Sequence, residues 1–384
     1  MLKTLENEVR VPAWLFSLYC FAIPFEAFLH LEVLGGTLIR YIGMITICSM
    51  AFYMIIKREK ICFPNSAKLL LVFFLWAGAS VFWSADPEHA FGRFMYEIRY
   101  FLMFLAATAF PFSKKEVSLA VKAVIVSGII ASLYIIYTSI MTNQILENYT
   151  RSVISSGETM TGPNSVAGML ILPFSLLIGS VLAQKSRLSR LNVIFAFSIF
   201  SAVLFTGSRG GLLGLFTAFL SLLVFWGVSR RGAALLSVIS GFCYWLFLEV
   251  SERVAKLSER FVFSGDLNRF SANRIDIWSK GFETWMNSPL IGYGYANYIV
   301  VSGTNMSSHN IYLGALLELG IIGFFLIVSS LASLLLFKPS DETQKSAFSG
   351  ALGVLVLSAT LYTMNFNYFW LALILVEISK KRTA

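Results

Sequence analysis

The chain has 384 residues, of which 57% are hydrophobic and only 13% are charged. Soluble domains carry about 25% charged residues, so this composition excludes an ordinary soluble globular protein. A net charge of +9 would suggest nucleic-acid binding in a soluble protein, but in a membrane protein the basic residues report which loops face the cytoplasm. We therefore expect membrane lipids around the chain and no nucleic-acid partner.

Apolar stretches near the length that crosses a bilayer core of ~30 Å recur along the whole sequence. They predict an all-α polytopic membrane bundle of about 12 transmembrane helices, forming a single transmembrane domain over residues 1–384. No cleavable signal peptide is visible, because residues 1–10 are polar. The predicted spans are 11–29, 38–56, 68–84, 97–111, 117–141, 164–183, 191–206, 211–228, 233–249, 310–337, 346–363 and 367–379.

Most of the 30 lysines and arginines lie at the two termini and in alternate loops, as at Lys57, Lys114 and Arg230. The positive-inside rule then predicts that both termini are cytoplasmic. On the opposite, extracytoplasmic side lie the turn at Arg209, the start of the tenth span at His309 and one large loop. That loop covers residues 250–308 and is inserted between spans nine and ten.

The large loop is not a flexible linker, because its middle part carries apolar residues at helical spacing. These residues are Ile275, Trp278, Phe282 and Trp285. They predict a short amphipathic helix near 272–286, which Pro289 and the following glycines end. An amphipathic helix of this kind can lie at the membrane surface.

The segment FTGSRGGLLG, residues 205–214, forms a tight turn between spans seven and eight. Ser208 is a candidate N-cap for the following helix. The backbone N–H groups at that helix start, together with Arg209, make a candidate anion site. The alternative interpretation is a glycine hairpin whose arginine extends to lipid headgroups.

The segment SSHNIYLGALLELG, residues 307–320, begins the tenth span. Asn310 is a candidate N-cap, and His309 is either an interfacial residue or a general base, because imidazole titrates near neutral pH. A helix N-terminus and nearby arginines would favour the neutral imidazole that accepts a proton. Glu318 lies inside the span and needs a partner or a polar cavity.

Further cations are expected on the same side as His309. Arg274 heads the predicted amphipathic helix, with Arg269 nearby, and Arg99 lies just inside the fourth span. The alternative role for the loop arginines is contact with anionic lipid. The four cysteines show no paired or metal-ligand spacing, and no acidic pair suggests a metal site.

Five motifs in this order resemble the O-antigen ligase and polymerase superfamily. They are GPNSVAGML (162–170), SRGGLLGL (208–215), NRIDIW (273–278), PLIGYGYAN (289–297) and SSHNIYLGALLELGIIG (307–323). The resemblance covers most of residues 80–330 and is strongest over 205–325.

The resemblance implies a multi-pass glycosyltransferase of the bacterial inner membrane. Its donor is a glycan on undecaprenyl pyrophosphate, presented at the periplasmic face. A ligase transfers that glycan to a sugar hydroxyl of lipid A–core, and a polymerase transfers it to another repeat unit. The reaction implied is inverting and needs no metal, nucleotide or other cofactor.

The resemblance also implies roles for particular residues. The family's helix-opening histidine matches His309, the implied general base. Its SRG arginine matches Arg209, and its loop arginine before a tryptophan matches Arg274, with Arg269 as the alternative match. We add Arg99 as a further candidate ligand of the pyrophosphate, and Ser208, Asn310 and Glu318 as supporting residues.

We expect an O-antigen ligase, with an O-antigen or exopolysaccharide polymerase of the same superfamily as the alternative. A polysaccharide flippase or transporter is a remote alternative. A transporter would be expected to have ionisable residues near mid-membrane and two related halves. Here the polar candidates gather on one predicted side, and no two halves align.

Overall fold

A computed structural model describes residues 9–31, 36–141, 153–156, 159–183, 189–227, 271 and 273–380. The predicted ninth span at 233–249, Arg269 and residues 250–270 of the predicted large loop lie outside the described residues. The described helices are α2 (Val11–Ala22), η1 (Ile23–Leu29), α3 (Leu38–Ile56), α4 (Asn65–Ala79), η3 (Ser80–Trp83), α5 (Pro87–Ala109), α6 (Lys114–Met141), α7 (Pro163–Ala183), α8 (Ser189–Phe205), α9 (Arg209–Trp226), α13 (Arg274–Trp285), α14 (Tyr298–Val301), α15 (Ile311–Leu335), α16 (Glu342–Ser358) and α17 (Asn367–Lys380).

The structure is helical throughout, as the composition predicts, apart from two short antiparallel ribbons that the sequence did not suggest. One ribbon pairs β1 (His30–Leu31) with β2 (Gly36–Thr37), and the other pairs β3 (Ile154–Ser156) with β4 (Thr159–Thr161). Within the described residues, seven helices are long and apolar enough to cross a membrane. A multi-pass membrane protein is thus supported, and the predicted number of twelve spans is not confirmed.

The fourth predicted span differs most from the observed helix. We predicted residues 97–111, whereas α5 begins ten residues earlier, at Pro87. Asp86 caps this helix by accepting a hydrogen bond from the backbone N–H of His89 at 3.0 Å. The first turns contain charged residues, which hydropathy excludes from a span. They fold as helix because the cap and Pro87 at the first helical position start it there.

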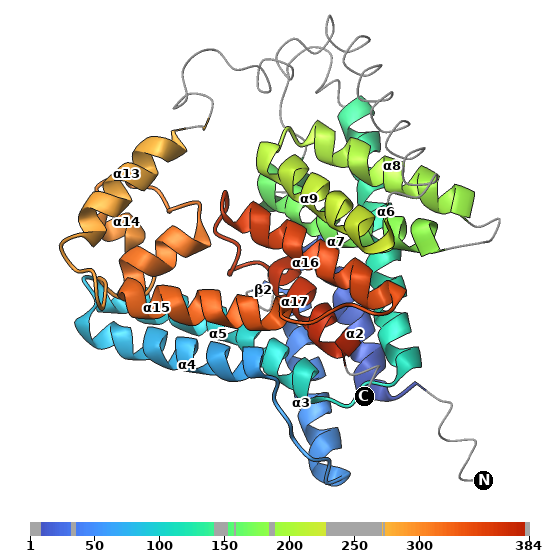
Figure 1. Ribbon diagram of the computed structural model, residues 1–384, viewed down its shortest axis with the longest axis horizontal. Coiled ribbons are helices and arrows are strands. Elements are labelled where there is room, and N and C mark those ends of the chain that lie inside the picture. Colours follow the sequence, from blue (N-terminus) through green and yellow to red (C-terminus); the bar gives the residue numbers. More distant parts are fainter. Residues whose placement is uncertain are drawn as a thin grey trace, which may run out of the picture.

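The centre of the bundle is formed by α7 and α17, which are buried on all sides. Helix α7 packs against α6, α8, α9 and α16, and α17 packs against α5 and α16. A helix that is apolar all round is expected at such a position. Figure 1 shows α13 and α14 apart from this centre, beside the first part of α15.

The helix ends form two groups. In one group the start of α4 meets the end of α17, where the Ser66 hydroxyl donates to Glu377 at 2.6 Å. The start of α16 meets the same end, where the Gln344 amide donates to the carbonyl of Ser379 at 3.1 Å. The start of α2 lies on this side too, away from α13 and α14 (Figure 1). The second group includes the start of α9 at Arg209 and the turn at His309 that precedes α15, which are linked by Trp278: it lines a cavity with Arg209 and donates to the carbonyl of Ser308.

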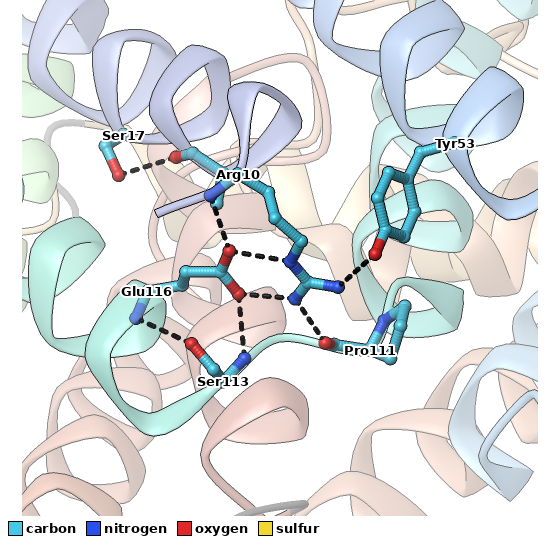
Figure 2. A network of polar contacts seen from close by, with 7 residues as sticks. Arg10, Ser17, Tyr53, Pro111, Ser113 and Glu116 are labelled. Atoms are coloured by element: carbon cyan, nitrogen blue, oxygen red, sulfur yellow. Dashed lines mark hydrogen bonds and ion pairs between the residues drawn. The ribbon is translucent and has the colours of Figure 1, made fainter. Parts of the chain in front are cut away.

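Figure 2 shows the ion pair that fastens the start of α2 to the start of α6. Arg10 donates through Nε to Glu116 Oε1 at 2.8 Å and through a second guanidinium nitrogen to Glu116 Oε2. The same guanidinium lies over the rings of Tyr53 and Phe110, 5.1 and 4.5 Å from their centroids. Glu116 is buried, with 1% of its side chain exposed. One arginine therefore joins α2, α3 and α6 and the turn that follows α5.

We predict that Arg10→Gln and Glu116→Gln each lower the thermal unfolding temperature of the purified protein in detergent. Removing one partner of a buried ion pair costs ~3–5 kcal/mol, and the 25% exposure of Arg10 places this pair near or below the lower value. The double variant should lose less stability than the sum of the two single variants. Lys114→Gln, an exposed residue of the same helix start, is the control; equal losses in all variants would contradict the assignment.

Candidate active site

Helix α15 is broken at Gly320, and the motif at 289–297 fills the break. Gly320 has φ of 67°, outside helical geometry. A Cβ at this position would lie 2.1 Å from the carbonyl oxygen of Leu290, so only glycine fits. The broken helix leaves carbonyl and N–H groups without helical partners, which is costly in a membrane.

Four of the groups at the break have partners in the inserted segment or on α4. The carbonyl of Leu317 accepts from Tyr293 N at 3.2 Å, and that of Glu318 accepts from Gly294 N at 2.8 Å. The Trp76 indole donates to the carbonyl of Leu319 at 3.1 Å. Beyond the break, Ile321 N donates to the carbonyl of Pro289 at 2.9 Å. The motif PLIGYGYAN therefore acts as a backbone insert that completes the tenth span.

The Glu318 carboxylate also has its partners in this segment. Its Oε2 accepts from Ala296 N at 3.0 Å, and its Oε1 accepts from Tyr298 N at 3.3 Å. Glu318 is 4% exposed. The carboxylate thus finds the partner that its position within a span requires, in the form of two backbone N–H groups. Its position indicates a positioning role, because it holds the loop from which α14 and the His309 segment continue.

His309 lies directly before α15, in the left-handed region, with φ of 47°. Asn310 caps the helix as predicted, accepting from Tyr312 N and Leu313 N. The Trp278 indole donates to the carbonyl of Ser308 at 2.9 Å, which ties α13 to this turn. A non-glycine residue in this conformation stores backbone strain and is held by its surroundings.

The His309 imidazole is partly buried, and its Nδ1 has no hydrogen-bond partner among the described residues. Burial lowers the pKa of His309, and the positive charge of Arg274 lowers it further. Both effects favour the neutral ring, which accepts protons. An unpartnered buried nitrogen is uncommon in a folded protein and indicates a site where another molecule supplies the partner.

Arg209 is the first residue of α9. Ser208 caps this helix as predicted, accepting from Gly211 N at 3.1 Å. A Cβ at Gly210 would lie 2.2 Å from Thr360 Oγ1, so the glycine lets α9 begin against the turn after α16. Arg209 and Thr360 line the same cavity.

Arg209 and Arg274 line one cavity of about 690 Å³, together with Trp278 and Thr360. The amphipathic helix that carries Arg274 is confirmed as α13, with Ile277 and Gly281 buried. The rest of the cavity wall is apolar and includes Phe174, Phe200, Leu204, Leu213, Phe216 and Phe219. Phe216 and Leu213 are 55% and 50% exposed, so the apolar side is open at the surface of the helix bundle. The cavity suits an amphiphile with an anionic head.

A second, smaller cavity of about 200 Å³ adjoins the same turn and is more polar. Ser307 and Ser308 line it, together with His89, Arg93, Glu318 and Tyr362. The turn that contains His309 therefore adjoins both cavities. Ser308 lines the small polar cavity, and Trp278, which donates to the Ser308 carbonyl, lines the large cavity.

Beside the polar cavity lies a buried carboxylate that the sequence did not single out. Glu97 pairs with Arg93 at 2.9 Å and accepts the hydroxyls of Tyr295 and Tyr362 at 2.6 and 3.2 Å. This cluster fixes the inserted segment to α5 and to the turn after α16. The available signal was a glutamate within a predicted span. The signal was missed because the prediction began that span at residue 97, which made Glu97 an end residue.

The structure does not bring Arg99 to this site. Arg99 lines a separate cavity with Glu26, Arg40 and Asn367. Arg269, the alternative to Arg274, lies outside the described residues. In the described ranges, no group of three His, Cys, Asp or Glu side chains has the arrangement that holds a metal ion.

Residues 193–328 match the family model described as O-antigen ligase. The matched segment contains α9, α13, the inserted segment 289–297 and the His309 turn, and the motif-based recognition of the O-antigen ligase superfamily is thereby confirmed. No curated protein sequence matches the chain.

We predict that Glu318→Leu destabilises the protein, because the N–H groups of Ala296 and Tyr298 lose their acceptor. Each unsatisfied buried donor costs ~1–3 kcal/mol. Glu318→Gln keeps one carbonyl oxygen and should lose less. Thermal unfolding in detergent measures both, with the exposed Glu283→Gln as control; a stable Glu318→Leu protein would show that the inserted segment does not depend on this carboxylate.

Proposed function

We propose that this chain, a member of the O-antigen ligase superfamily, is a glycosyltransferase that moves a glycan from undecaprenyl pyrophosphate to a sugar hydroxyl of lipid A–core. The observation that carries the proposal is that two guanidinium groups line one apolar-walled cavity, and that the positive charge of one of them, Arg274, acts on the His309 imidazole. That imidazole has a buried nitrogen without a hydrogen-bond partner among the described residues. A polyprenyl pyrophosphate has the matching chemistry, which is a long apolar chain and an anionic head.

In the proposed donor complex, the prenyl chain lies along the exposed apolar wall of α9, and the pyrophosphate contacts Arg209 and Arg274. Guanidinium groups bind phosphate oxygens with two parallel hydrogen bonds. The N-terminus of α9 adds backbone N–H groups and a favourable dipole for an anion at the same place. The apolar surroundings strengthen these charge interactions relative to water.

The chemistry requires one proton transfer and one displacement. His309 accepts the proton of the acceptor hydroxyl, and the oxygen forms a bond to the anomeric carbon of the donor glycan. The bond from that carbon to the pyrophosphate oxygen breaks, and the electron pair leaves with undecaprenyl pyrophosphate. Arg209 and Arg274 stabilise the charge that develops on this leaving group. The direct displacement inverts the anomeric centre, and the imidazolium returns its proton to solvent.

The small polar cavity suits the acceptor sugar in this proposal. Its hydroxyl-bearing and charged lining offers hydrogen bonds to a carbohydrate, whereas the large cavity offers mostly apolar contacts. The acceptor hydroxyl then approaches His309 from one side and the donor from the other. The leaving group is already activated, so these residues complete the reaction without a metal or nucleotide. The extracytoplasmic face of the inner membrane is the proposed location, with both termini cytoplasmic.

The test is transfer by the purified protein in nanodiscs, with undecaprenyl-pyrophosphate-linked glycan as donor. Lipid A–core and a second lipid-linked repeat unit are offered as acceptors in separate reactions. Glycan appearing on lipid A–core is the expected result. Chain extension on the repeat unit alone would contradict the ligase and identify a polymerase. Movement of the donor across a bilayer without a new glycosidic bond would identify a transporter.

We predict that His309→Ala lowers the transfer rate by about 10²–10⁴-fold, the range for loss of a general base. Binding of the donor should be retained, because the cations of its cavity remain. Initial rates and donor affinity in nanodiscs separate these effects. A variant that transfers at a rate near that of the wild-type protein would remove His309 from the proposed role.

The pH dependence gives this prediction a second readout. The wild-type rate should fall on acidification as His309 takes up a proton, with a midpoint below the ordinary value of 6.5, because its pKa is lowered. Arg274→Gln removes a positive charge and should move the midpoint of the remaining activity upward. An unchanged midpoint in that variant would show that the charge of Arg274 does not act on the His309 imidazole.

We predict that Arg209→Lys loses most of its transfer activity although the charge is kept. An ammonium group cannot reproduce the planar, two-pronged contact of a guanidinium. Arg58→Lys, a cation at the end of α3 and in the other group of helix ends, is the matched control. Activity is compared at saturating donor; a rate near that of the wild-type protein for Arg209→Lys would assign Arg209 a structural role at the start of α9.

A further inference from the structure

A third cavity, of about 520 Å³, lies between η1, α3, α5 and the start of α17. It shares no lining residue with either cavity beside His309. The proposed reaction places neither the donor nor the acceptor in this third cavity. The chemistry of its lining residues indicates which ligand it would bind.

The charged and amide side chains that line this cavity come from four helices. Glu26 lies in η1, Arg40 in the first turn of α3, and Asn367 begins α17. Arg99 comes from the middle of α5 but lines the same cavity. Because α5 begins well before the apolar part of its sequence, its middle reaches the level at which the neighbouring helices begin or end. Arg99 therefore lines the same cavity as Arg40 at the start of α3 and Asn367 at the start of α17.

The Arg99 guanidinium is held in place by aromatic rings. It lies 3.9 Å from the centroid of Tyr96 and 4.7 Å from that of Tyr100, and it donates to the Tyr100 hydroxyl at 2.9 Å. These contacts orient the guanidinium but do not neutralise it. In the described part of the chain, no carboxylate lies within ion-pair distance of Arg99 or Arg40.

Glu26, the acidic residue among the described lining residues, interacts electrostatically with Arg99 without forming an ion pair with it. Its carboxylate accepts from the Thr37 hydroxyl at 3.2 Å and from the Asn367 amide at 3.1 Å. Among the described lining residues there are two arginines and one carboxylate, which leaves an excess of positive charge. An anion bound near the two arginines would neutralise this excess charge. The dipole at the N-terminus of α3 also favours an anion.

The remainder of the cavity is apolar and runs away from the arginines. From Arg40 to Cys48 the lining follows α3 for eight residues, which is ~12 Å at 1.5 Å per residue. Met44, Ile47, Leu102 and Met103 complete it. Met44 and Leu102 are 52% and 45% exposed, so this groove is open along the surface of α3 and α5. A cationic end joined to an open apolar groove has the form of a lipid site.

We propose that this groove binds one anionic phospholipid of the surrounding membrane. The phosphate contacts Arg40 and Arg99, and one acyl chain lies along the apolar groove between α3 and α5. The arginines supply charge-assisted hydrogen bonds to phosphate oxygens, and the groove discriminates a lipid from a free anion. The proposal rests on this cavity alone and is independent of the transfer reaction.

The test is lipid retention by the intact purified protein in a neutral detergent, measured by native mass spectrometry. Phosphatidylglycerol and phosphatidylcholine are added at equal concentration. The wild-type protein should retain phosphatidylglycerol preferentially. The double variant Arg40→Gln/Arg99→Gln should weaken this retention by at least about tenfold, because each lost charged contact is worth about that factor. Thermal unfolding without added lipid verifies that the variant is folded.

Two further variants separate this site from general attraction to a charged membrane. Lys57→Gln removes an exposed cation just beyond the other end of α3 and should leave retention unchanged. Cys48→Trp fills the apolar groove while both arginines remain, and it should weaken retention. An equal loss in Lys57→Gln, or full retention in the double arginine variant, would overturn the proposal.

Inorganic phosphate and glycerol phosphate are the competitors that distinguish the two sources of a phosphate group. They should displace phosphatidylglycerol only weakly, since they gain nothing from the groove. Full displacement by inorganic phosphate, together with full retention in Cys48→Trp, would show that the arginines bind a free anion and that no lipid site exists.

Discussion

The break in α15 at Gly320 is the constraint on which the site depends. An uninterrupted helix would satisfy its own backbone and would have no place for a loop. Here the carbonyls of residues 317–319 turn to partners outside the helix, and the segment 289–297 supplies two of the three. Because unsatisfied backbone groups are costly inside a membrane, the loop and the span hold each other. The loop is thereby fixed in position relative to the helix that begins after His309.

This constraint accounts for how residues far apart in the chain come together. Tyr298 directly follows the inserted segment, and its hydroxyl donates to the carbonyl of Ile277 in α13 at 2.6 Å. Helix α13 in turn carries Arg274 into the large cavity and holds the Ser308 carbonyl through Trp278. Arg209 arrives independently, through the close approach of α9 to Thr360. Burial lowers the pKa of His309, and the positive charge of Arg274 lowers it further. In the proposed reaction, Arg209 and Arg274 together bind the leaving group.

How much of this was predictable depended on whether the signal was local. The N-caps Ser208 and Asn310 and the amphipathic helix α13 follow from short-range patterns and were predicted correctly. The predicted start of the fourth span was wrong. Hydropathy penalises the charged residues before residue 97, but the Asp86 cap starts the helix at Pro87. The need of Glu318 for a partner was predicted from burial, but its backbone donors at 296 and 298 were not, since a helix break filled by a distant loop is not visible in periodicity.

The location of Arg99 shows the same limit. Its predicted place on the same side of the membrane as Arg209 and Arg274, just inside the fourth span, suggested a shared anion site. The structure places it in a separate groove, because the direction in which a side chain of α5 points depends on how the whole helix packs. Local sequence predicted neither the number of spans nor the separation of Arg99 from the cavity of Arg209 and Arg274.

We propose that Arg209, Arg274 and His309 surround one bound donor. The decisive measurement is a cryo-electron microscopy structure of the His309→Gln variant in nanodiscs, with intact undecaprenyl-pyrophosphate-linked glycan. We expect pyrophosphate oxygens at about 2.7–3.2 Å from both guanidinium groups, with the first sugar directed toward residue 309. A donor whose pyrophosphate lies away from these two arginines, or on the side of the bundle where α2 begins, would contradict it.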